Sequence, residues 1–481
     1  MMTREDYIQE YPKHEDMRQN ANQDRYRLQY HLMPPTGFLN DPNGLCQKDG
    51  VYHIYFQYTP FDSGWGTKLW GHYTSKDMIT FTKEEPFLYP DMEADRDGVY
   101  SGSAFIKDGK IHYFYTGNVK LTDKQDYDYI CSGREQNTIH MTSEDGYHIS
   151  EKKVVLTNDD YPSDMSKHVR DPKIFEKDGY YYMVLGGRTK ENQGCALLYR
   201  SLDLENFEYY NRIILPDFGY MWECPDLFEK DGQLFLMTCP QGLQQSGYDY
   251  ENVYQMGYFK VDYDFEQNTY TLSDFREIDH GFDIYAPQSF VDEKGRRIMI
   301  AWMGIPDADY DNQPTVDCDW QHALTMPRVL SYHHGHIYQQ PIKEMQQLRQ
   351  ECLVSCCQQI KQTDTICFEM SIDFEKKEDF KLQIRDDVTL DYHQDILTLS
   401  LGKSGHGRTQ RHLQIKSINN LTIYSDTSSL EIFINDGEEV MTTRVYSSSF
   451  HQEIRFLTEN EGLVHFYPLK GYEILESDRD E

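Results

Sequence analysis

Five short turns, each built on a glycine and followed by an aromatic-rich, strand-like run, recur along the N-terminal two thirds of the chain. They lie in KDGVYHIYFQY (48–58), KDGKIHYFYTG (107–117), KDGYYYMVLGG (177–187), KDGQLFLMTCP (230–240) and EKGRRIMIAWMG (293–304). Asp-Gly between apolar runs is a strong hairpin signal. The turns are roughly sixty residues apart and further strand candidates lie between them, which predicts a unit of about four strands repeated five times. Such a repeat is typical of a five-bladed β-propeller, a closed ring of sheets around a channel.

The pattern changes after Pro327 and Arg328, where the glycine turns stop recurring. Period-two alternation then predicts an antiparallel β-sandwich built from the segments 366–374, 380–387, 395–402 and 430–446. A chain of 481 residues is too long for one ordinary core, which favours two domains. We therefore predict an all-β protein with an N-terminal polar arm (1–30), a propeller (31–335), a connector (336–353) and a sandwich (354–481).

The formal net charge of −33 excludes several classes of partner. Nucleic acids and anionic membranes need Lys and Arg on the protein, so neither is expected to bind. No apolar run is long enough to cross a bilayer, and residues 1–20 lack the apolar core of a secretory signal. Ten cysteines without paired spacing are interpreted as reduced thiols. These features predict a cytoplasmic protein.

Three carboxylates, Asp41, Asp171 and Glu223, each precede a hairpin glycine by eight or nine residues. An acid near a proline is usually only a turn former, so any one of the three is weak support for a site. The shared register places them at equivalent points on the first strands of the first, third and fourth units. First strands line the channel of a propeller, so we expect the three acids to meet in one pocket.

Paired carboxylates in unlike environments are what glycoside hydrolysis requires. Glu223 has apolar flanks and no basic neighbour in sequence, which favours the protonated form of a general acid. Asp41 follows Asn40 in a polar stretch that would keep it ionised, as a nucleophile must be. Asp171 follows Arg170, which would hold it as an anion suited to binding sugar hydroxyls. A metal site made from the same acids is the alternative, but no histidine lies within a few residues of Asp41 or Glu223.

The segments FLNDPNG (38–44), VRDP (169–172) and WECPDLF (222–228) resemble the signature blocks of glycoside hydrolase family 32, the invertase and fructanase family. Further blocks match in order: FQY (56–58), GWGTKLWGH (64–72), YSGSA (100–104), YAPQ (285–288), AWMG (301–304), LTMPR (324–328) and LEIFINDGE (430–438). Two positions depart from the common pattern, His168 before the VRDP block and Tyr100 in YSGSA; both lie beside motif residues and neither removes a catalytic group.

The resemblance implies a propeller with a sandwich and retaining hydrolysis of a terminal β-fructofuranoside. By motif position Asp41 is the nucleophile, Glu223 the acid/base and Asp171 the transition-state stabiliser. The implied fructose pocket adds Asn40, Gln57, Trp65, Ser103, Arg170, Tyr285 and Trp302. No metal and no cofactor are expected, since no phosphate loop or dinucleotide fingerprint is found.

The expected substrate is a small sugar, sucrose or sucrose 6-phosphate, because a cytoplasmic enzyme would meet a short imported substrate. Three alternatives stay open at this point. One is an exo-fructanase acting on kestose or short inulin or levan chains, and another is a fructosyltransferase. The third is a non-catalytic carbohydrate-binding propeller, which would have no need of both Asp41 and Glu223. The sandwich allows a homo-oligomer, whose existence the sequence leaves open.

Overall fold

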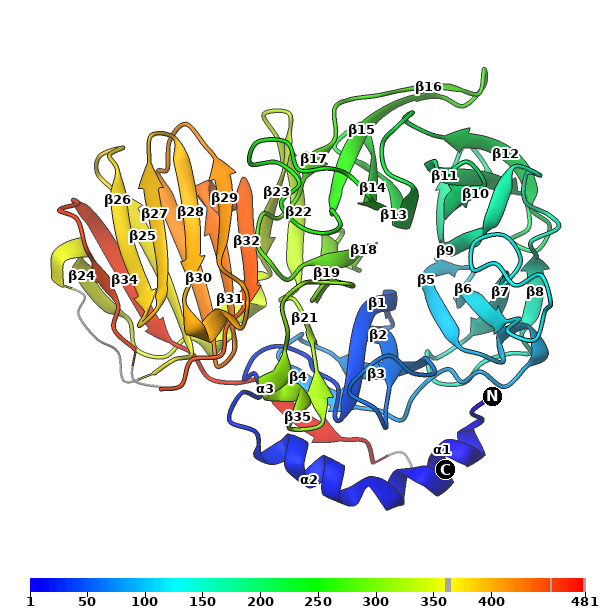
Figure 1. Cartoon of the computed structure of the whole chain (residues 1–481), viewed down its shortest axis with the longest axis horizontal. Helices are drawn as coiled ribbons and strands as arrows, with labels where there is room; N and C mark the ends of the chain where they lie inside the picture. Colours follow the sequence, from blue (N-terminus) through cyan, green and yellow to red (C-terminus); the bar gives the residue numbers. More distant parts are fainter. Residues whose placement is uncertain (360–364, 450–451, 479–481) are drawn as a thin grey trace.

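The computed structural model describes residues 1–359, 365–449 and 452–478, and these residues are built mainly from β-strands in seven sheets (Figure 1). The all-β prediction is therefore confirmed. The described helices are short: α1 (Arg4–Glu10), α2 (Glu15–Gln23), α3 (Gln313–Val316), and the 3₁₀ turns η1 (Tyr11–His14), η2 (Glu93–Asp95), η3 (Lys343–Leu348), η4 (Cys357–Gln359), η5 (Lys403–Gly405) and η6 (Asn435–Gly437). No helix within the described ranges is long and apolar enough to cross a membrane.

Five sheets follow one another along the chain, each antiparallel through its four main strands. Their strands are β1 (Gly37–Lys48), β2 (Val51–Thr59), β3 (Leu69–Ser75) and β4 (Thr80–Lys83); β5 (Val99–Lys107), β6 (Lys110–Lys120), β7 (Arg134–Ser143) and β8 (Lys153–Leu156); β9 (Met165–Lys177), β10 (Tyr180–Thr189), β11 (Gly194–Ser201) and β12 (Glu208–Ile213); β13 (Met221–Lys230), β14 (Gln233–Gln241), β15 (Gly257–Asp264), β16 (Thr269–Leu272) and β17 (Arg276–Glu277); β18 (Tyr285–Val291), β19 (Arg297–Met303), β21 (Ala323–Leu324), β22 (Arg328–His333) and β23 (His336–Pro341).

The first strands of these sheets close a ring. Strand β1 packs against β5, β5 against β9, β9 against β13 and β13 against β18, and β18 returns to β1. The glycine turns connect each first strand to the second, as predicted. In the first turn Asp49 and Gly50 have φ of 52° and 80°, the left-handed pair that a two-residue type I′ turn requires. The same Asp-Gly geometry recurs at Gly109, Gly179 and Gly232.

The two C-terminal sheets pack on each other through one apolar core, to which Ile372 of the first sheet and Leu382 of the second both contribute. One sheet contains β24 (Leu353–Cys356), β34 (Gly462–Pro468), β25 (Phe368–Phe374), β30 (Asn420–Asp426), β31 (Ser429–Ile434) and β32 (Glu439–Arg444), and the other β29 (Gln410–Gln414), β28 (Ile396–Leu401), β27 (Val388–His393), β26 (Phe380–Arg385) and β33 (Arg455–Phe456). In Figure 1 this pair of sheets lies to the left of the ring of five.

Two predicted boundaries are wrong. The connector expected over 336–353 begins with β23, which pairs with β22 along its whole length and belongs to the fifth sheet. The turn between these strands, His334 and Gly335 with φ of 51° and 84°, is another left-handed pair that lacks the Asp-Gly signature. At the other end, β35 (Glu473–Glu476) leaves the C-terminal sheets and pairs in parallel with β4 of the first sheet.

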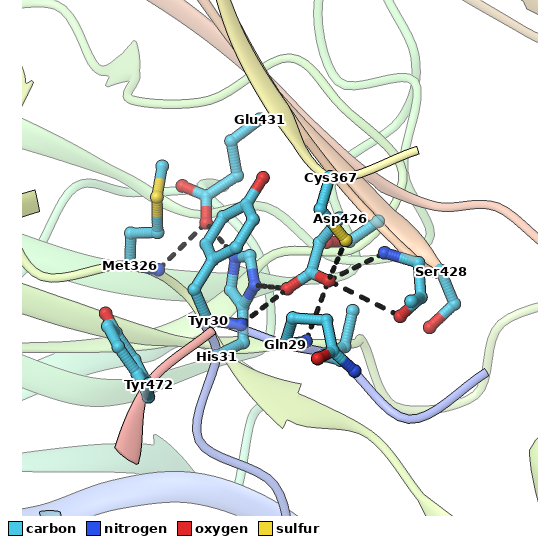
Figure 2. Close-up of polar contacts among 12 residues, drawn as sticks. Gln29, Tyr30, His31, Met326, Cys367, Asp426, Ser428, Glu431 and Tyr472 are labelled. Atoms are coloured by element: carbon cyan, nitrogen blue, oxygen red, sulfur yellow. Dashed lines mark hydrogen bonds and ion pairs between the residues drawn. The ribbon is translucent and has the colours of Figure 1, made fainter. Parts of the chain in front are cut away.

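The segment between α2 and β1 fastens the ring to the C-terminal sheets through a buried polar cluster (Figure 2). His31 lies between two carboxylates, with Nδ1 2.8 Å from Asp426 and Nε2 2.9 Å from Glu431. The backbone N–H of Tyr30 also donates to Asp426 at 3.0 Å. Arg328, at the start of β22, donates to the second oxygen of Glu431 from Nε at 3.0 Å and from Nη2 at 2.6 Å. One cluster therefore joins three distant stretches of the chain.

Candidate active site

Each first strand of the ring is interrupted by a bulge at the same level. The pairing register shifts between Leu39 and Pro42 in β1, and equivalent shifts occur in β5, β9, β13 and β18. A bulge bends the strand and re-aims side chains, and a proline there removes a ladder donor without loss. The bulge residues Asp171 and Cys224 have positive φ of 64° and 47°. The recurring acid-and-proline pattern is thus a set of bulges at the centre of the ring.

The bulges surround a cavity of about 380 Å³. Its lining contains all three predicted acids and six of the seven predicted pocket residues, namely Asn40, Gln57, Trp65, Arg170, Tyr285 and Trp302. The three acids come from β1, β9 and β13, so the expectation that they meet in one pocket is met.

Ser103 is the predicted pocket residue that does not line the cavity. Its hydroxyl is buried and donates to the carbonyl of Pro172 at 2.7 Å. Ser101 takes the expected place: it lines the cavity, accepts a hydrogen bond from Gln57 at 2.6 Å and donates to Oδ2 of Asp41. The register shift between Val99 and Gly102 contains Ser101, so that Ser101, and not the predicted Ser103, reaches the cavity.

Asp41 is held by short polar contacts from three side chains. Besides Ser101, Asn40 Nδ2 donates to its Oδ1 at 3.1 Å, and the Cys224 thiol lies 3.6 Å from its Oδ2. Burial raises the pKa of Asp41 above its ordinary value, the hydrogen bond from Ser101 opposes this shift, and the charge of Glu223 adds to it. The polar neighbours predicted to keep Asp41 ionised therefore only limit the rise of its pKa.

Asp171 is buried at the centre of the site. Its Oδ2 accepts the backbone N–H of Cys224 at 2.9 Å, and its own N–H donates to Thr116 at 2.9 Å. Burial raises the pKa of Asp171 to about 7, and the positive charge of Arg170 acts against that rise. Arg170 Nε lies 4.0 Å from Oδ2 of Asp171, and its charge favours the anion, as expected from the sequence, but does not cancel the effect of burial.

Arg170 is instead the main partner of Glu223. It donates to Oε1 from Nε at 3.0 Å and from Nη2 at 2.5 Å. Oε2 of Glu223 accepts from Gln241 Nε2 at 2.6 Å and from the Tyr285 hydroxyl at 2.8 Å. The apolar flanks on which the sequence prediction relied, Trp222 among them, do not describe the surroundings of this carboxylate.

Several cavity residues were not predicted from the sequence. They are Lys68, Tyr100, Ser101, Tyr129, Arg134, His168, Arg188, Tyr220, Met221, Gln241, Tyr254, Pro306 and Asp307. Tyr100 and His168 had been noted only as departures from a family pattern. Gln241 lies at the end of a second strand, in a stretch that carries no recognisable signal. Lys68 is buried against the rings of Phe38 and Trp65, and burial lowers its pKa to about 7.

Residues 31–341 match the family model described as the glycosyl hydrolases family 32 N-terminal domain, and residues 337–472 match the C-terminal model of the same family. The chain belongs to glycoside hydrolase family 32. It is therefore a glycoside hydrolase, and the resemblance of its sequence blocks to this family is confirmed. The cavity described above lies within the family 32 N-terminal region.

Named family 32 proteins are similar over nearly the whole chain. A sucrose-6-phosphate hydrolase of Bacillus subtilis is 39% identical over 90% of this chain and 92% of its own length. The structure of a sucrose-6-phosphate hydrolase from Lactobacillus gasseri is similar with a TM-score of 0.87, at 30% identity over 95% of this chain and 96% of the other. A Bombyx mori GH32 beta-fructofuranosidase mutant in complex with sucrose has a TM-score of 0.82 at 27% identity, covering 97% of this chain and 99% of that one.

Proposed function

We propose that this chain is a retaining β-fructofuranosidase that hydrolyses sucrose or sucrose 6-phosphate. The observation that carries the proposal is the meeting of Asp41, Asp171 and Glu223 in one cavity, with Arg170 bound to one oxygen of Glu223 only. The names of the similar sucrose-6-phosphate hydrolases support the same substrates.

In the first step Asp41 attacks the anomeric carbon of the fructosyl unit and Glu223 protonates the departing oxygen. Arg170 binds Oε1 of Glu223, which leaves Oε2 as the oxygen that carries the proton. The Tyr285 hydroxyl, 2.8 Å from Oε2, can accept from the protonated acid and donate to the carboxylate, because a hydroxyl does both.

In the second step Glu223 takes a proton from water, and the resulting hydroxide attacks the fructosyl ester on Asp41. Fructose leaves with retained configuration, and both carboxyl groups return to their starting state. A retaining pair needs its carboxyl groups about 5–5.5 Å apart, and we expect this separation for Asp41 and Glu223.

The fructose hydroxyls would be bound by polar atoms that lack partners within the described structure. Asn40 Oδ1 and Trp302 Nε1 are two buried atoms of this kind, and both residues line the cavity. Unsatisfied buried polar atoms are costly, so a site that keeps them is suited to a ligand rich in hydroxyl groups. Asp171, which is buried and lines the same cavity, would accept hydrogen bonds from further hydroxyls.

We also propose a domain organisation and a compartment. The ring of five sheets would be the five-bladed propeller of the catalytic domain, ending at Pro341, and the two C-terminal sheets a β-sandwich beginning at Leu353. The compartment that we propose is the cytoplasm. All ten cysteines are free thiols, which suits its reducing conditions.

Release of fructose from sucrose, sucrose 6-phosphate, 1-kestose and inulin by the purified protein tests the proposal. We expect turnover of the first two and its loss in Asp41→Ala, with the fold retained. Preference for 1-kestose or inulin would favour an exo-fructanase, and fructose transfer to a second sugar a fructosyltransferase. Binding of these sugars without any turnover would favour the non-catalytic alternative and contradict the proposal.

A further inference from the structure

Arg134 is a buried cation that lines the cavity without an acidic partner. It lies at the start of β7 and is 8% exposed. Its Nε is buried without a hydrogen-bond partner, and none of the ion pairs among the described residues includes Arg134. Its guanidinium lies 4.4 Å from the ring of Tyr129, which also lines the cavity.

Arg188 reaches the same cavity from the end of β10. Its guanidinium stacks 4.5 Å from the ring of Tyr220 and donates to the neutral Oδ1 of Asn192 at 3.0 and 2.6 Å. No carboxylate within the described ranges forms an ion pair with it. Asp307, the fourth carboxylate of the cavity, accepts from Tyr254 at 2.8 Å and is paired with neither arginine.

Arg134 is buried and Arg188 is half-buried, and both differ from the fully buried arginines of this protein. Among the described residues Arg385 and Arg444 also lack an ion pair, but hydroxyl and carbonyl oxygens accept from their guanidinium groups. Arg328 is neutralised by Glu431 at 2.6 Å, and Arg408 by Asp283 at 2.7 Å. The chain carries 80 acidic residues against 47 basic ones, so carboxylates are not scarce. An uncompensated buried charge destabilises a fold strongly. A guanidinium left without a carboxylate inside a cavity therefore points to an anion that arrives with a ligand.

His168 shows that positive charge is concentrated at this end of the cavity. Its Nε2 donates to the carbonyl of Tyr129 at 3.0 Å, so its Nδ1 accepts from Arg170 at 3.0 Å. Burial, together with the charges of Arg170, Arg134 and Arg188, lowers the pKa of His168 to about 2. Arg170 thus lies between Glu223 and His168. We call the side with Asp41, Asp171 and Glu223 the acidic end of the cavity, and the side with His168, Arg134 and Arg188 the basic end.

We propose that Arg134 and Arg188 form a subsite for a phosphate monoester carried on the leaving group of the substrate. The inference rests on the proposed fructosidase function and selects the phosphorylated disaccharide, with a hexose 6-phosphate as leaving group. A phosphate carries close to two negative charges at neutral pH, and forked guanidinium donors match its oxygens. The acidic end would repel such a group, which leaves the basic end for it.

The ratio of kcat/KM for sucrose 6-phosphate to kcat/KM for sucrose tests the subsite. We expect wild type to prefer the phosphorylated sugar and Arg134→Gln to lower the ratio by about 10- to 100-fold, the effect of losing a charge-assisted hydrogen bond. Arg188→Gln should lower it in the same direction. Arg200→Gln is the matched control, because Arg200 stacks on Tyr210 outside the cavity and its loss changes the net charge equally. An unchanged ratio in Arg134→Gln would overturn the proposal.

A second measurement uses the wild-type enzyme and does not depend on whether a variant folds. Glucose 6-phosphate, glucose and inorganic phosphate are compared as inhibitors of sucrose hydrolysis by the wild-type enzyme. Inhibition by glucose 6-phosphate at concentrations at least tenfold lower than either of the others supports the subsite. Equal inhibition by glucose and glucose 6-phosphate overturns it, and so does inhibition by inorganic phosphate as strong as that by glucose 6-phosphate. An enzyme that releases no fructose yet binds glucose 6-phosphate in calorimetry, and loses that binding in Arg134→Gln, would contradict the fructosidase function and keep the subsite.

Discussion

Arg170 donates two hydrogen bonds to Oε1 of Glu223, at 3.0 and 2.5 Å, although its own neighbour in sequence is Asp171. The contact fixes one oxygen of the proposed acid/base, and the other oxygen, which accepts only from the neutral groups of Gln241 and Tyr285, exchanges the proton. It also places one positive charge among three carboxylates, where like charges and burial raise the pKa values of Asp41 and Asp171.

Arg170→Lys should impair catalysis without unfolding the protein. Lysine is a point donor and cannot reproduce the two-pronged contact with Glu223, so we expect kcat/KM to fall by about 10- to 100-fold. The control is Arg212→Lys, which alters a comparable two-pronged contact with Asp164, at 2.7 and 2.7 Å, outside the cavity. Steady-state kinetics on a fructoside provide the measurement, and equal losses in the two variants would contradict the role of Arg170.

Ser101→Ala should change the pH dependence of the reaction. The hydrogen bond from Ser101 lowers the pKa of Asp41, so its removal raises that pKa further. Because the nucleophile must be ionised, activity is lost as the pH falls through the pKa of Asp41, and the acidic limb of kcat/KM should move to higher pH. We expect about tenfold less activity at pH 5 and a smaller loss at pH 8.

Ser103→Ala is the matched control for that shift, since its hydroxyl binds the Pro172 carbonyl and not an acid. Profiles of kcat/KM from pH 4 to 9 distinguish the two serines. A limb that moves equally in both variants, or in neither, would show that Ser101 does not hold the proposed nucleophile.

Truncation of Trp65 should weaken substrate binding without loss of stability, whereas truncation of Trp302 should lower the free energy of unfolding. Trp65 is 62% exposed at the mouth of the cavity, so Trp65→Ala should raise KM about tenfold through lost sugar stacking and leave the free energy of unfolding nearly unchanged. Trp302 is 1% exposed, and Trp302→Ala should lower the free energy of unfolding by about 3–5 kcal/mol. Urea unfolding and KM are measured for both variants; a large loss of stability in Trp65→Ala would rule out an exposed platform.

His31→Gln should give a loss of stability that depends on pH. Burial opposes the charged imidazolium, but the hydrogen bonds and charges of Asp426 and Glu431 raise the pKa of His31 overall. A raised pKa gives stability that is complete below the ordinary pKa of histidine and is lost as the pH rises through the raised value. We expect His31→Gln to cost about 3–5 kcal/mol near pH 6 and less at higher pH.

Asp426 and Glu431 set the acidic limit of the pH range in which the charged cluster stabilises the fold. Their pKa values are lowered in the fold, so their contribution is lost as the pH falls through those values. The control is His148→Gln, because His148 pairs with Asp145 at 2.7 Å on the surface, where a pair contributes little. Urea unfolding from pH 5 to 9 measures both variants, and a constant cost of His31→Gln over this range would contradict a charged His31.

The repeat of the fold could be predicted because Asp-Gly turns are local signals. Asp49 and Gly50 adopt the left-handed pair by their own chemistry, so spacing alone located the hairpins. The hairpin at Gly335 uses a histidine in place of the aspartate and was missed, which misplaced the connector. The pairing of β35 with β4 joins residues far apart in sequence, and no local pattern encodes it.

The strand register predicts which strands bring the three acids to the candidate site, but it does not predict how the bulges orient their side chains. The positions of the three acids followed from their distance to the hairpin glycine. Ser101 lines the cavity in place of Ser103, and Arg170 pairs with Glu223, because of the way each bulge orients its side chains. Sequence neighbours do not reveal this orientation. Arg134 and Arg188 were missed because they lie on second and third strands outside the recognised blocks.

Trapping the covalent intermediate shows which carboxylate is the nucleophile. Glu223→Ala is incubated with β-D-fructofuranosyl fluoride, whose leaving group needs no proton from an acid, and the protein is digested and analysed by mass spectrometry. Without Glu223 to activate water the intermediate should persist. We predict that the peptide containing Asp41 gains the mass of one fructosyl unit. Consumption of the fluoride with no modified peptide, or a label on Asp171 in place of Asp41, would contradict it.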